Sequence, residues 1–493
     1  MKTEARTSSA MHAPGAILLI SCYELGHRPA GLTRPLRALE MAGFAPDVID
    51  IAVEPLDVEK VGRAQFIGIS VPMHTALRLG VHLLHRIRQI NPDVSICMYG
   101  LYATLNADYL LSHGVDFCLP SSVTPQPPLS GGQVRDTSSE GQVRDTSSGG
   151  QIRDTSSGGQ VRDTSTQLVA LVQSVVEGEQ IETQKTGFRT AKLPPLEVYA
   201  QFEDNGEVRT VGYTETTHGC KHLCTHCPIP PVYNGKFSVI QRDTVLAEIQ
   251  EQVGQGATHI TFGDPDFLNG PTHGLRILRA MHEAYPNLTF DFTTKVEHIL
   301  KHRKHFPEFA QLGCKFVISA VESLSETVLT ILEKHHTRDD VKAAIDIVHG
   351  ASIALRPTWV PFTPWTTLDD YLEIFQFVDT HRLVYHVDPV QYAVRLLIPP
   401  GSYLLNRPET KALSLTLDEA AFSYTWAHPD ARMDELHKTV NALVENDARA
   451  GVDALETFYR IWTLAADMQG QPSPKQSKGV HQPAPRITEA WFC

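Results

Sequence analysis

The sequence has none of the features that mark a membrane protein, a secreted protein or a nucleic-acid-binding protein. It contains no apolar run long enough to span a bilayer. The run at residues 16–21 is short, has no cleavage site after it and predicts a buried strand. An excess of basic residues is also absent: the formal net charge is −13, whereas binding to a phosphate backbone requires basic surface. We therefore expect no membrane segment and no nucleic-acid partner.

The eight cysteines do not form a disulfide framework or a second CxxC pair. Five of them are isolated: Cys22, Cys97, Cys118, Cys314 and Cys493. Because disulfide frameworks are typical of secreted domains, this pattern predicts a reducing, cytoplasmic location. Structural zinc sites usually use two CxxC pairs, so the missing second pair also disfavours zinc.

The remaining cysteines, Cys220, Cys224 and Cys227, have the spacing CxxxCxxC directly after a predicted strand at residues 211–216. Three thiolates on a short loop can bind three irons of a [4Fe–4S] cluster and leave the fourth iron open to an external ligand. Barrels of alternating strands and helices place their chemistry at such strand ends. The alternative is a zinc ion with His222 or His226 as the fourth ligand.

Residues 15–122 alternate short β-rich runs with amphipathic helical stretches. The predicted strands are at 16–21, 46–51, 65–71, 94–99 and 115–119, and helical stretches include 33–42, 76–89 and 102–112. This alternation predicts a doubly wound, Rossmann-like parallel sheet. Ligands of such sheets bind outside the carboxyl ends of the strands.

Residues 123–168 predict a disordered linker between domains. They contain four consecutive repeats of a nonapeptide whose second copy is Gly141–Gly149, Gly-Gln-Val-Arg-Asp-Thr-Ser-Ser-Gly. The period is too short and too polar for a solenoid, and the segment has almost no apolar residues to bury. We expect it to carry no chemistry.

Residues 200–401 predict a partial, open (β/α)6 barrel. Strand signals occur at 211–216, 259–262, 288–293 and 315–320, then in a fifth run that includes 354–356 and a sixth at 390–401. A helical region follows at 402–468 and a flexible tail at 469–493. The predicted fold class is thus α/β, with a Rossmann-like domain followed by a barrel and a helical extension.

The cysteine segment resembles the radical S-adenosylmethionine (SAM) superfamily, and the similarity extends over about residues 208–401. The segment Glu322-Ser323-Leu324-Ser325, followed by Lys334-His335-His336-Thr337, resembles a signature of that family. The turn Gly263-Asp264-Pro265-Asp266 replaces the family's Gly-Gly-Glu-like turn, in a version similar to that of B12-associated subfamilies.

The resemblance implies a [4Fe–4S] cluster on the three cysteines and SAM on its free iron. A reduced cluster would then break a carbon–sulfur bond of SAM and generate a 5′-deoxyadenosyl radical. The cofactor-binding candidates that it implies are His226 beside the adenine, Gly263 and Asp264 in the amino-group turn, Lys295, Glu322 near the ribose or the amino group, Arg356 at the carboxylate, and Gln391. Three alternatives stay open: a plain turn at Gly263, a helix N-terminal charge at Glu322, and an ion pair with a neighbouring acid at Arg356.

A Rossmann-like domain before such a barrel resembles the cobalamin-binding domain of B12-dependent radical SAM enzymes. The loop after the first strand departs from their DxHxxG signature, because Leu25 and Ala30 replace its Asp and Gly around His27. Many methylases of this group lack the histidine as well. Cobalamin and a Rossmann-like module used for packing or substrate contact are therefore both open.

The last residues, Trp491-Phe492-Cys493, resemble the start of the tail of the CUAEP/CCAEP radical SAM family. In that family a selenocysteine or cysteine follows. We expect the chain to stop at an in-frame UGA codon, which the next codons would test, and we take Cys493 as a candidate catalytic thiol. The alternative is a frayed terminus with an incidental cysteine.

Three hypotheses on function follow from these patterns. The first is a radical SAM enzyme, with or without cobalamin-dependent methyl transfer, acting on a small molecule or peptide and reduced by a flavodoxin or ferredoxin. The second is transfer of the aminocarboxypropyl group of SAM to a soft arsenic or selenium acceptor. The third is a non-enzymatic zinc-binding or redox module.

Overall fold

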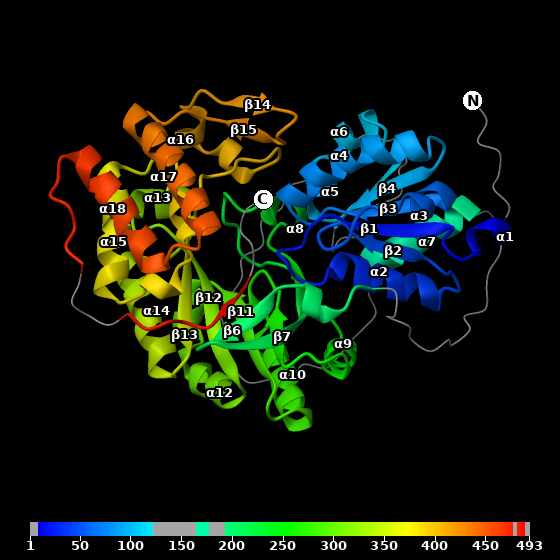
Figure 1. Ribbon diagram of the computed structural model, residues 1–493, viewed down its shortest axis with the longest axis horizontal. Coiled ribbons are helices and arrows are strands. Elements are labelled where there is room, and N and C mark those ends of the chain that lie inside the picture. Colours follow the sequence, from blue (N-terminus) through cyan, green and yellow to red (C-terminus); the bar gives the residue numbers. More distant parts are fainter. Residues whose placement is uncertain (1–7, 122–163, 177–192, 477–480, 489–493) are drawn as a thin grey trace, which may run out of the picture.

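The computed structural model describes residues 8–121, 164–176, 193–476 and 481–488. Its N-terminal part is a five-stranded parallel sheet with the strand order β2-β1-β3-β4-β5 (Figure 1). The strands are β1 (Ile17–Ser21), β2 (Asp47–Asp50), β3 (Phe66–Ser70), β4 (Ser95–Tyr99) and β5 (Phe117–Leu119). The order reverses between β1 and β3, and doubly wound sheets bind their ligands at such a switch point. The predicted Rossmann-like sheet is confirmed.

Helices cover both faces of this sheet. α2 (Ala30–Met41) and α7 (Thr164–Val176) pack on one face. The other face is covered by α3 (Val58–Arg63), α4 (His74–Ile90), α5 (Leu101–Leu105) and α6 (Ala107–Ser112). The short α1 (Ser8–Met11) precedes the sheet. Continuous burial of β1 and β3 on both faces explains why their sequences are apolar without alternation.

The linker predicted at residues 123–168 overlaps α7. Leu168 and Val172 of this helix are fully buried against the α2 side of the sheet. Residues 164–168 therefore belong to the Rossmann-like domain, because burial of these side chains offsets the cost of ordering the helix. The nonapeptide repeats lie outside the described residues.

The second sheet has seven strands in the order β13-β12-β11-β10-β7-β6-β16 and forms a curled half-barrel (Figure 1). The five parallel strands are β7 (Glu207–Thr214), β10 (His259–Phe262), β11 (Thr289–Thr294), β12 (Cys314–Glu322) and β13 (Ala354–Trp359). β6 (Gln201–Asp204) pairs antiparallel with β7, and β16 (Arg486–Ile487) pairs antiparallel with β6. The predicted α/β barrel architecture is confirmed.

Helices pack on the outer face of the half-barrel around an aromatic core that includes Phe262, Phe290 and Phe292. These helices are α9 (Arg242–Gly254), α10 (Pro271–Ala284), α11 (Val296–Lys301), α12 (Phe306–Gln311), α13 (Glu326–Ile331), α14 (Arg338–Gly350) and α15 (Leu368–Thr380). Capping boxes begin α14 and α15, where Thr337 and Thr367 bond with Asp340 and Asp370. No helix within the described ranges has the length and apolar character needed to cross a membrane.

The sixth parallel strand predicted at residues 390–401 is wrong. Residues 389–393 form a 3-10 helix, and only an isolated bridge between Phe362 and Arg395 continues the parallel pairing. Pro389 cannot donate to a strand ladder. In the 3-10 helix, the backbone bonds with a side chain where a strand would bond with its neighbour: the Tyr371 hydroxyl donates to the Tyr392 carbonyl oxygen at 2.9 Å.

The C-terminal region contains two long helices, α17 (Ala431–Ala450) and α18 (Ala454–Gln469), which pack against α15 and the 3-10 helix at residues 389–393. The region predicted as helical also holds the short α16 (Pro408–Lys411) and a hairpin of β14 (Thr416–Asp418) and β15 (Ser423–Thr425). The tail predicted to be flexible includes β16. Ile487 packs beside Phe202 and Phe316 across the open side of the half-barrel, which supplies the burial that orders this strand.

The Rossmann-like domain packs against the barrel next to β7. Arg34 of α2 forms ion pairs with Glu215 at 2.7 Å and Glu248 at 3.1 Å, and the His27 ring packs on Tyr213 with centroids 4.9 Å apart. The loop at the carboxyl end of β1 therefore faces the second domain.

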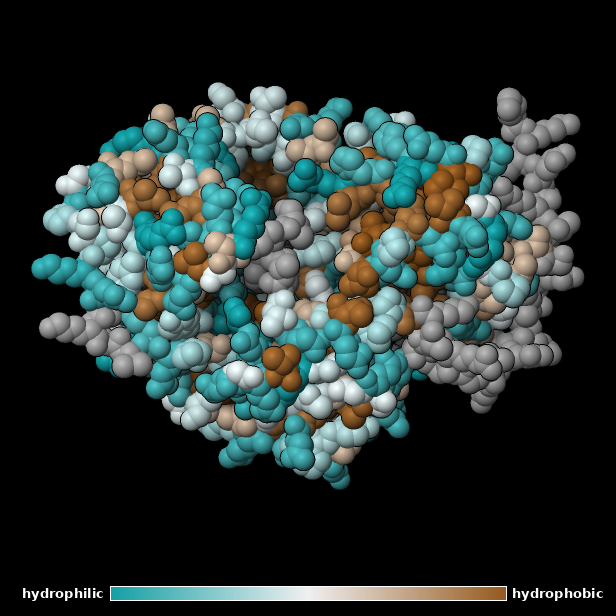
Figure 2. All heavy atoms as spheres, viewed as in Figure 1, coloured by the Kyte–Doolittle hydropathy of each residue, from teal (hydrophilic) through white to brown (hydrophobic). Residues whose placement is uncertain are grey.

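In Figure 2, apolar side chains gather on the visible face of the Rossmann-like domain, whereas polar residues dominate over the barrel helices.

Candidate active site at the carboxyl edge of the half-barrel

The three cysteines lie on a loop held between two short antiparallel strands, β8 (Thr217–Gly219) and β9 (Phe237–Val239), with α8 (Pro230–Tyr233) between them. Cys220 and Cys224 are buried, Cys227 is partly exposed, and all three thiols are free. Gly219 precedes them with φ +80°, and a Cβ there would meet the Lys236 carbonyl oxygen at 2.6 Å. A glycine is therefore required where the loop begins.

Thr225, inside the cysteine motif, anchors the loop to the rest of the barrel. Its amide donates to the Leu332 carbonyl oxygen at 3.1 Å and its hydroxyl to that of Ile331 at 2.7 Å, at the end of α13. The Thr225 carbonyl oxygen accepts hydrogen bonds from the Leu404 amide and the Ser402 hydroxyl. The segment between Cys224 and Cys227 is thus held both by the end of α13 and by residues 402–404.

The environment of Cys220 and Cys227 favours the protonated thiol when no metal is present. Burial raises the pKa of Cys227 to about 12 and also raises the pKa of Cys220, and the charges of neighbouring cysteines add to both shifts. Lys334 opposes the shift at Cys227. Such thiols become thiolates when a metal displaces their protons, as cluster binding requires.

Glu322 ends β12 beside this loop. It pairs with Lys334 at 3.1 Å and with the His226 Nε2 at 3.4 Å, and both charged side chains are buried. Burial alone would raise the pKa of Glu322, but Lys334 and His226 outweigh it and hold the pKa well below its usual range. Its φ of +69° and the register shift beside it mark a strained strand end, a feature that clusters at functional sites.

The turn after β10 also contacts the cysteine segment. Asp264 is buried and its carboxylate accepts hydrogen bonds from the Thr216 amide and from the hydroxyls of Thr216 and Thr217, at 2.6 to 2.8 Å. Burial raises the pKa of Asp264, against these hydrogen bonds. A Cβ at Gly263 would collide with the Tyr213 hydroxyl. The Asp264 carboxylate therefore fixes the residues that lead into β8 through three hydrogen bonds.

Lys295, which follows β11, faces the same loop from another side. Its Nζ lies 3.3 Å from the His222 Nδ1 and 3.5 Å from a Glu297 carboxylate oxygen. The structure therefore gathers His226, Gly263, Asp264, Lys295 and Glu322 around the segment with the three cysteines.

Arg356 and Gln391 have other partners in the part of the chain that the structure describes. Arg356 forms an ion pair with Asp388 at 2.8 Å and donates to the Pro485 carbonyl oxygen at 3.3 Å. The side-chain oxygen of Gln391 accepts a hydrogen bond from the Trp359 amide at 3.1 Å. Arg356 thus forms an ion pair with a neighbouring acid, which was the alternative to binding a ligand carboxylate. Cys493 lies outside the described residues.

Sequence reasoning missed several residues of the site. Lys334 stands in the Lys-His-His-Thr segment but was not predicted to be a site residue. Asp266 and His298 carry no local signal, because only the tertiary fold brings them to His222. Thr225 could have been found from its place inside the cysteine motif.

The carboxyl edge of the Rossmann-like sheet is the second place where a cofactor could bind. The loop after β1 carries Glu24, whose carboxylate accepts from the Gly31 amide at 3.1 Å and lies 3.4 Å from the Ser70 hydroxyl. The ring of His27 in this loop contacts Tyr213 at an interplanar angle of 30°, and burial lowers the pKa of His27 to about 4. The histidine of this loop is thus in contact with the barrel strand β7.

The pKa of Glu24 predicts how stability changes with pH. Burial is the main cause that raises the pKa of Glu24 to about 8, and nearby acids add to the shift. The pKa of a glutamate in an unfolded chain is about 4.3. The folded state then binds more protons between these values, so stability should fall as pH rises from about 4.3 to 8. The Glu24→Gln variant cannot ionise at this position, so it should not lose stability as the pH rises. The difference in melting temperature between this variant and the wild type should therefore be larger at pH 8 than at pH 5.

The matched control is Glu59→Gln on the exposed side of α3, which should melt like wild type at both pH values. A Glu24→Gln gain that is the same at pH 5 and pH 8 would contradict the assigned pKa.

Comparisons with known proteins agree with this architecture. Residues 214–374 match the family model of the Radical SAM superfamily. Among curated relatives, the ribosomal protein uS12 methylthiotransferase RimO of Clostridium botulinum is 21% identical over 191 residues, which are 35% of this chain and 40% of that protein. RimO of Elusimicrobium minutum is 22% identical over 34% of this chain. The chain thus spans about two fifths of the length of these relatives.

Two solved structures share the fold of both domains. The radical SAM methyltransferase TsrM from Kitasatospora setae, with cobalamin and a [4Fe–4S] cluster bound, matches with a TM-score of 0.53 at 14% identity, over 74% of this chain and 70% of that one. The cobalamin-dependent SAM radical enzyme OxsB, with aqua-cobalamin bound, matches with a TM-score of 0.59 at 14% identity, over 87% and 67%. At this identity, the likeness shows the fold.

Proposed function

We propose that the protein is a radical SAM enzyme that binds a [4Fe–4S] cluster on Cys220, Cys224 and Cys227 and cleaves SAM reductively, because residues 214–374 match the family model of that superfamily. The observation that carries this proposal is the convergence of the cysteine loop, His226 and the Glu322–Lys334 pair at one strand edge. When bound, cluster and SAM supply the electron transfer and the carbon-centred radical; the protein's own task is to bind, orient and shield them.

The residues around the loop have separate tasks in this proposal. Lys334 places a buried positive charge near Cys224 and Cys227, and this charge opposes the rise in the pKa of Cys227. Glu322 keeps its negative charge at neutral pH and can accept hydrogen bonds from a ligand. The Nδ1 of His226 is buried without a hydrogen-bond partner in the described residues, so it is available to a ligand at this edge.

We further propose that the reaction is cobalamin-dependent methyl transfer. Two solved proteins with this two-domain fold, TsrM and OxsB, hold cobalamin, and TsrM is a methyltransferase. In this chain the β1–β3 switch point adjoins β7 through the contact of His27 with Tyr213. This contact supports a cobalamin-type site next to the edge with the cysteines.

Aminocarboxypropyl transfer is the alternative, and the direction of β16 is the observation that favours it. β16 is antiparallel to β6, as β7 is, so it runs towards the carboxyl edge of the sheet. Cys493 follows Thr488 by five residues, which span at most about 17 Å when extended. The Thr488 amide donates to the Gln201 carbonyl oxygen, and Gln201 pairs with Thr210 of β7. The four residues of β7 from Thr210 to Thr214 cover about 13 Å. In this proposal the chain that follows β16 is directed towards the edge that carries the cysteine loop.

The products of SAM turnover test the choice between these reactions. The protein is reconstituted with iron and sulfide without oxygen, reduced with flavodoxin or dithionite, and incubated with SAM with and without cobalamin. Methyl transfer predicts S-adenosylhomocysteine that forms only when cobalamin is added. Methylthioadenosine as the main product would favour aminocarboxypropyl transfer, and intact SAM under all conditions would contradict both.

A further inference from the structure

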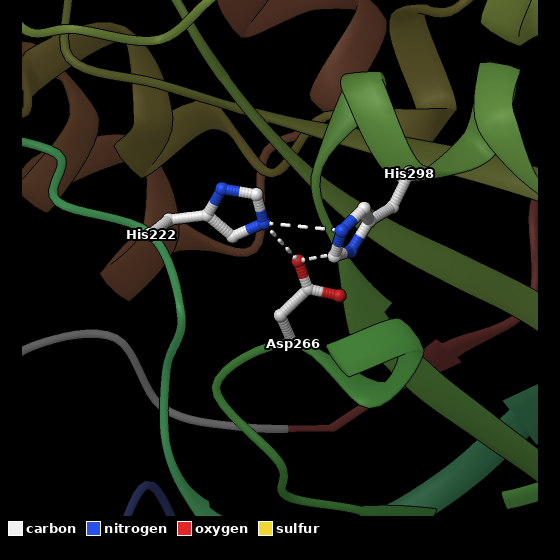
Figure 3. Close-up of side chains that lie close together, drawn as sticks. All are labelled: His222, Asp266 and His298. Atoms are coloured by element: carbon white, nitrogen blue, oxygen red, sulfur yellow. Dashed lines mark hydrogen bonds and ion pairs between the residues drawn. The ribbon is translucent and has the colours of Figure 1, made fainter. Parts of the chain in front are cut away.

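Three side chains from separate elements converge beside the cysteine loop (Figure 3). His222 comes from the loop itself, Asp266 from the turn after β10, and His298 from α11. One ligand atom from each lies within 4.8 Å of the others. This cluster, His222–Asp266–His298, has no role in the binding of SAM or the iron–sulfur cluster proposed above.

Two spacings in the cluster are close to those between the ligands of a metal ion of the first transition row. The Nε2 atoms of His222 and His298 are 3.2 Å apart, and the His222 Nε2 lies 3.6 Å from the Asp266 Oδ2. Ligands that bind zinc at about 2.0–2.1 Å in tetrahedral geometry are separated by about 3.4 Å. Two histidines and one carboxylate also form the facial site of non-haem ferrous proteins.

The side chains in this cluster are buried and incompletely hydrogen-bonded. Asp266 is 0% exposed and His298 is 1% exposed. The Asp266 Oδ2 and the His298 Nδ1 lie 2.8 Å apart, yet neither has a hydrogen bond of acceptable geometry in the described residues. A fully buried carboxylate oxygen that is paired with a histidine but not well hydrogen-bonded is incompletely stabilised, and a bound cation would stabilise it further.

The groups around the cluster orient its ligands. The other oxygen of Asp266 accepts hydrogen bonds from the Thr294 hydroxyl at 2.7 Å and the Leu268 amide at 3.1 Å, which aims Oδ2 at the histidines. Glu297 lies 3.7 Å from the His222 Nδ1 and can accept a proton from it, as carboxylates do behind metal-bound histidines. The Lys295 ammonium also lies near this nitrogen, and Glu297 pairs with it at 3.5 Å.

We propose that His222, Asp266 and His298 bind one divalent transition-metal ion, zinc or ferrous iron, separate from the iron–sulfur cluster. This ion would connect the cysteine loop to the β10 turn and to α11, and leave at least one coordination position open. The site is distinct from the one proposed for SAM, so it stands even if the protein performs different chemistry there.

Cobalt(II) is the probe for this site, because its visible absorption reports the ligands. The anaerobically reconstituted full-length protein is treated with a chelator, dialysed against cobalt(II), and analysed for cobalt, iron and sulfide. We expect one cobalt per chain in addition to an unchanged cluster, without sulfur-to-cobalt charge-transfer bands. Zinc should compete with it at the same stoichiometry.

Variants identify the ligands. His298→Asn and Asp266→Asn should each weaken cobalt binding by at least about 100-fold, and Glu297→Gln by about tenfold. His302→Asn, one turn further along the chain, is the matched control and should bind cobalt like wild type. Iron and sulfide content shows that each variant is folded at the neighbouring cysteine loop. Absence of cobalt from the wild-type protein, or unchanged affinity in both His298→Asn and Asp266→Asn, would overturn the proposal.

Discussion

Replacing Cys224 by alanine is expected to remove the iron–sulfur cluster and to lower SAM cleavage by at least about 1,000-fold, a barrier increase of about 4 kcal/mol. Cys224 is a buried free thiol, and the adjacent Thr225 holds its loop through hydrogen bonds to Ile331 and Leu332. Loss of one thiolate leaves too few protein ligands for a cluster whose fourth iron is open. Iron and sulfide analysis, together with chromatography of the SAM products, measures both effects.

Cys118→Ala is the matched control for this variant. Cys118 is a free, partly exposed cysteine on β5 of the other domain. Its replacement should leave iron content and SAM cleavage at the wild-type level. A Cys224→Ala protein that keeps its iron and sulfide would contradict the assignment of the cluster to this loop.

Replacing Lys334 by methionine is expected to cost about 3–5 kcal/mol of unfolding free energy, because it leaves a buried carboxylate without its cation. The side chains of Glu322 and Lys334 are 10% and 3% exposed and lie 3.1 Å apart. Glu322 keeps only His226 as a partner in the described residues, so its pKa should also rise towards its usual range. Anaerobic guanidinium unfolding, followed by a probe within the barrel, measures the change.

Two further variants separate the pair from general effects of substitution. Arg407→Met removes a more exposed ion pair, with Glu333 at 3.0 Å, and should cost no more than about 1 kcal/mol. The double variant Glu322→Gln with Lys334→Met should recover part of the stability that Lys334→Met loses. Equal losses for Lys334→Met and Arg407→Met would show that the Glu322–Lys334 pair is not the buried ion pair described above.

The sequence predicted those parts of the fold that local patterns specify. The five strands expected in the first domain match β1 to β5; β1 and β3 are buried on both faces, so their sequences are continuously apolar. The cysteine spacing and the Glu322 segment located the site for the same reason: each lies directly after a strand, where a parallel sheet collects its side chains.

Long-range contacts decided the rest. Residues 390–401 carry strand-like side chains, yet Pro389 and the hydrogen bond from Tyr371 hold the 3-10 helix that is observed. Ile487 lies in a stretch rich in proline and polar residues, and it becomes a strand only because β6 offers a free edge. Arg356 was predicted to bind a ligand carboxylate, and Asp388 is 32 residues away in the chain, so the sequence could not identify it as the partner.

The central claim is that the loop of Cys220, Cys224 and Cys227 binds a redox-active cluster that cleaves SAM. The most direct measurement is electron paramagnetic resonance of the reconstituted, reduced protein before and after SAM is added, with product analysis of the same samples. We predict a [4Fe–4S]⁺ signal that changes when SAM binds, and SAM cleavage that requires both the reductant and Cys224. Protein that binds no iron or sulfide on this loop after reconstitution, and that leaves SAM intact, would contradict the claim.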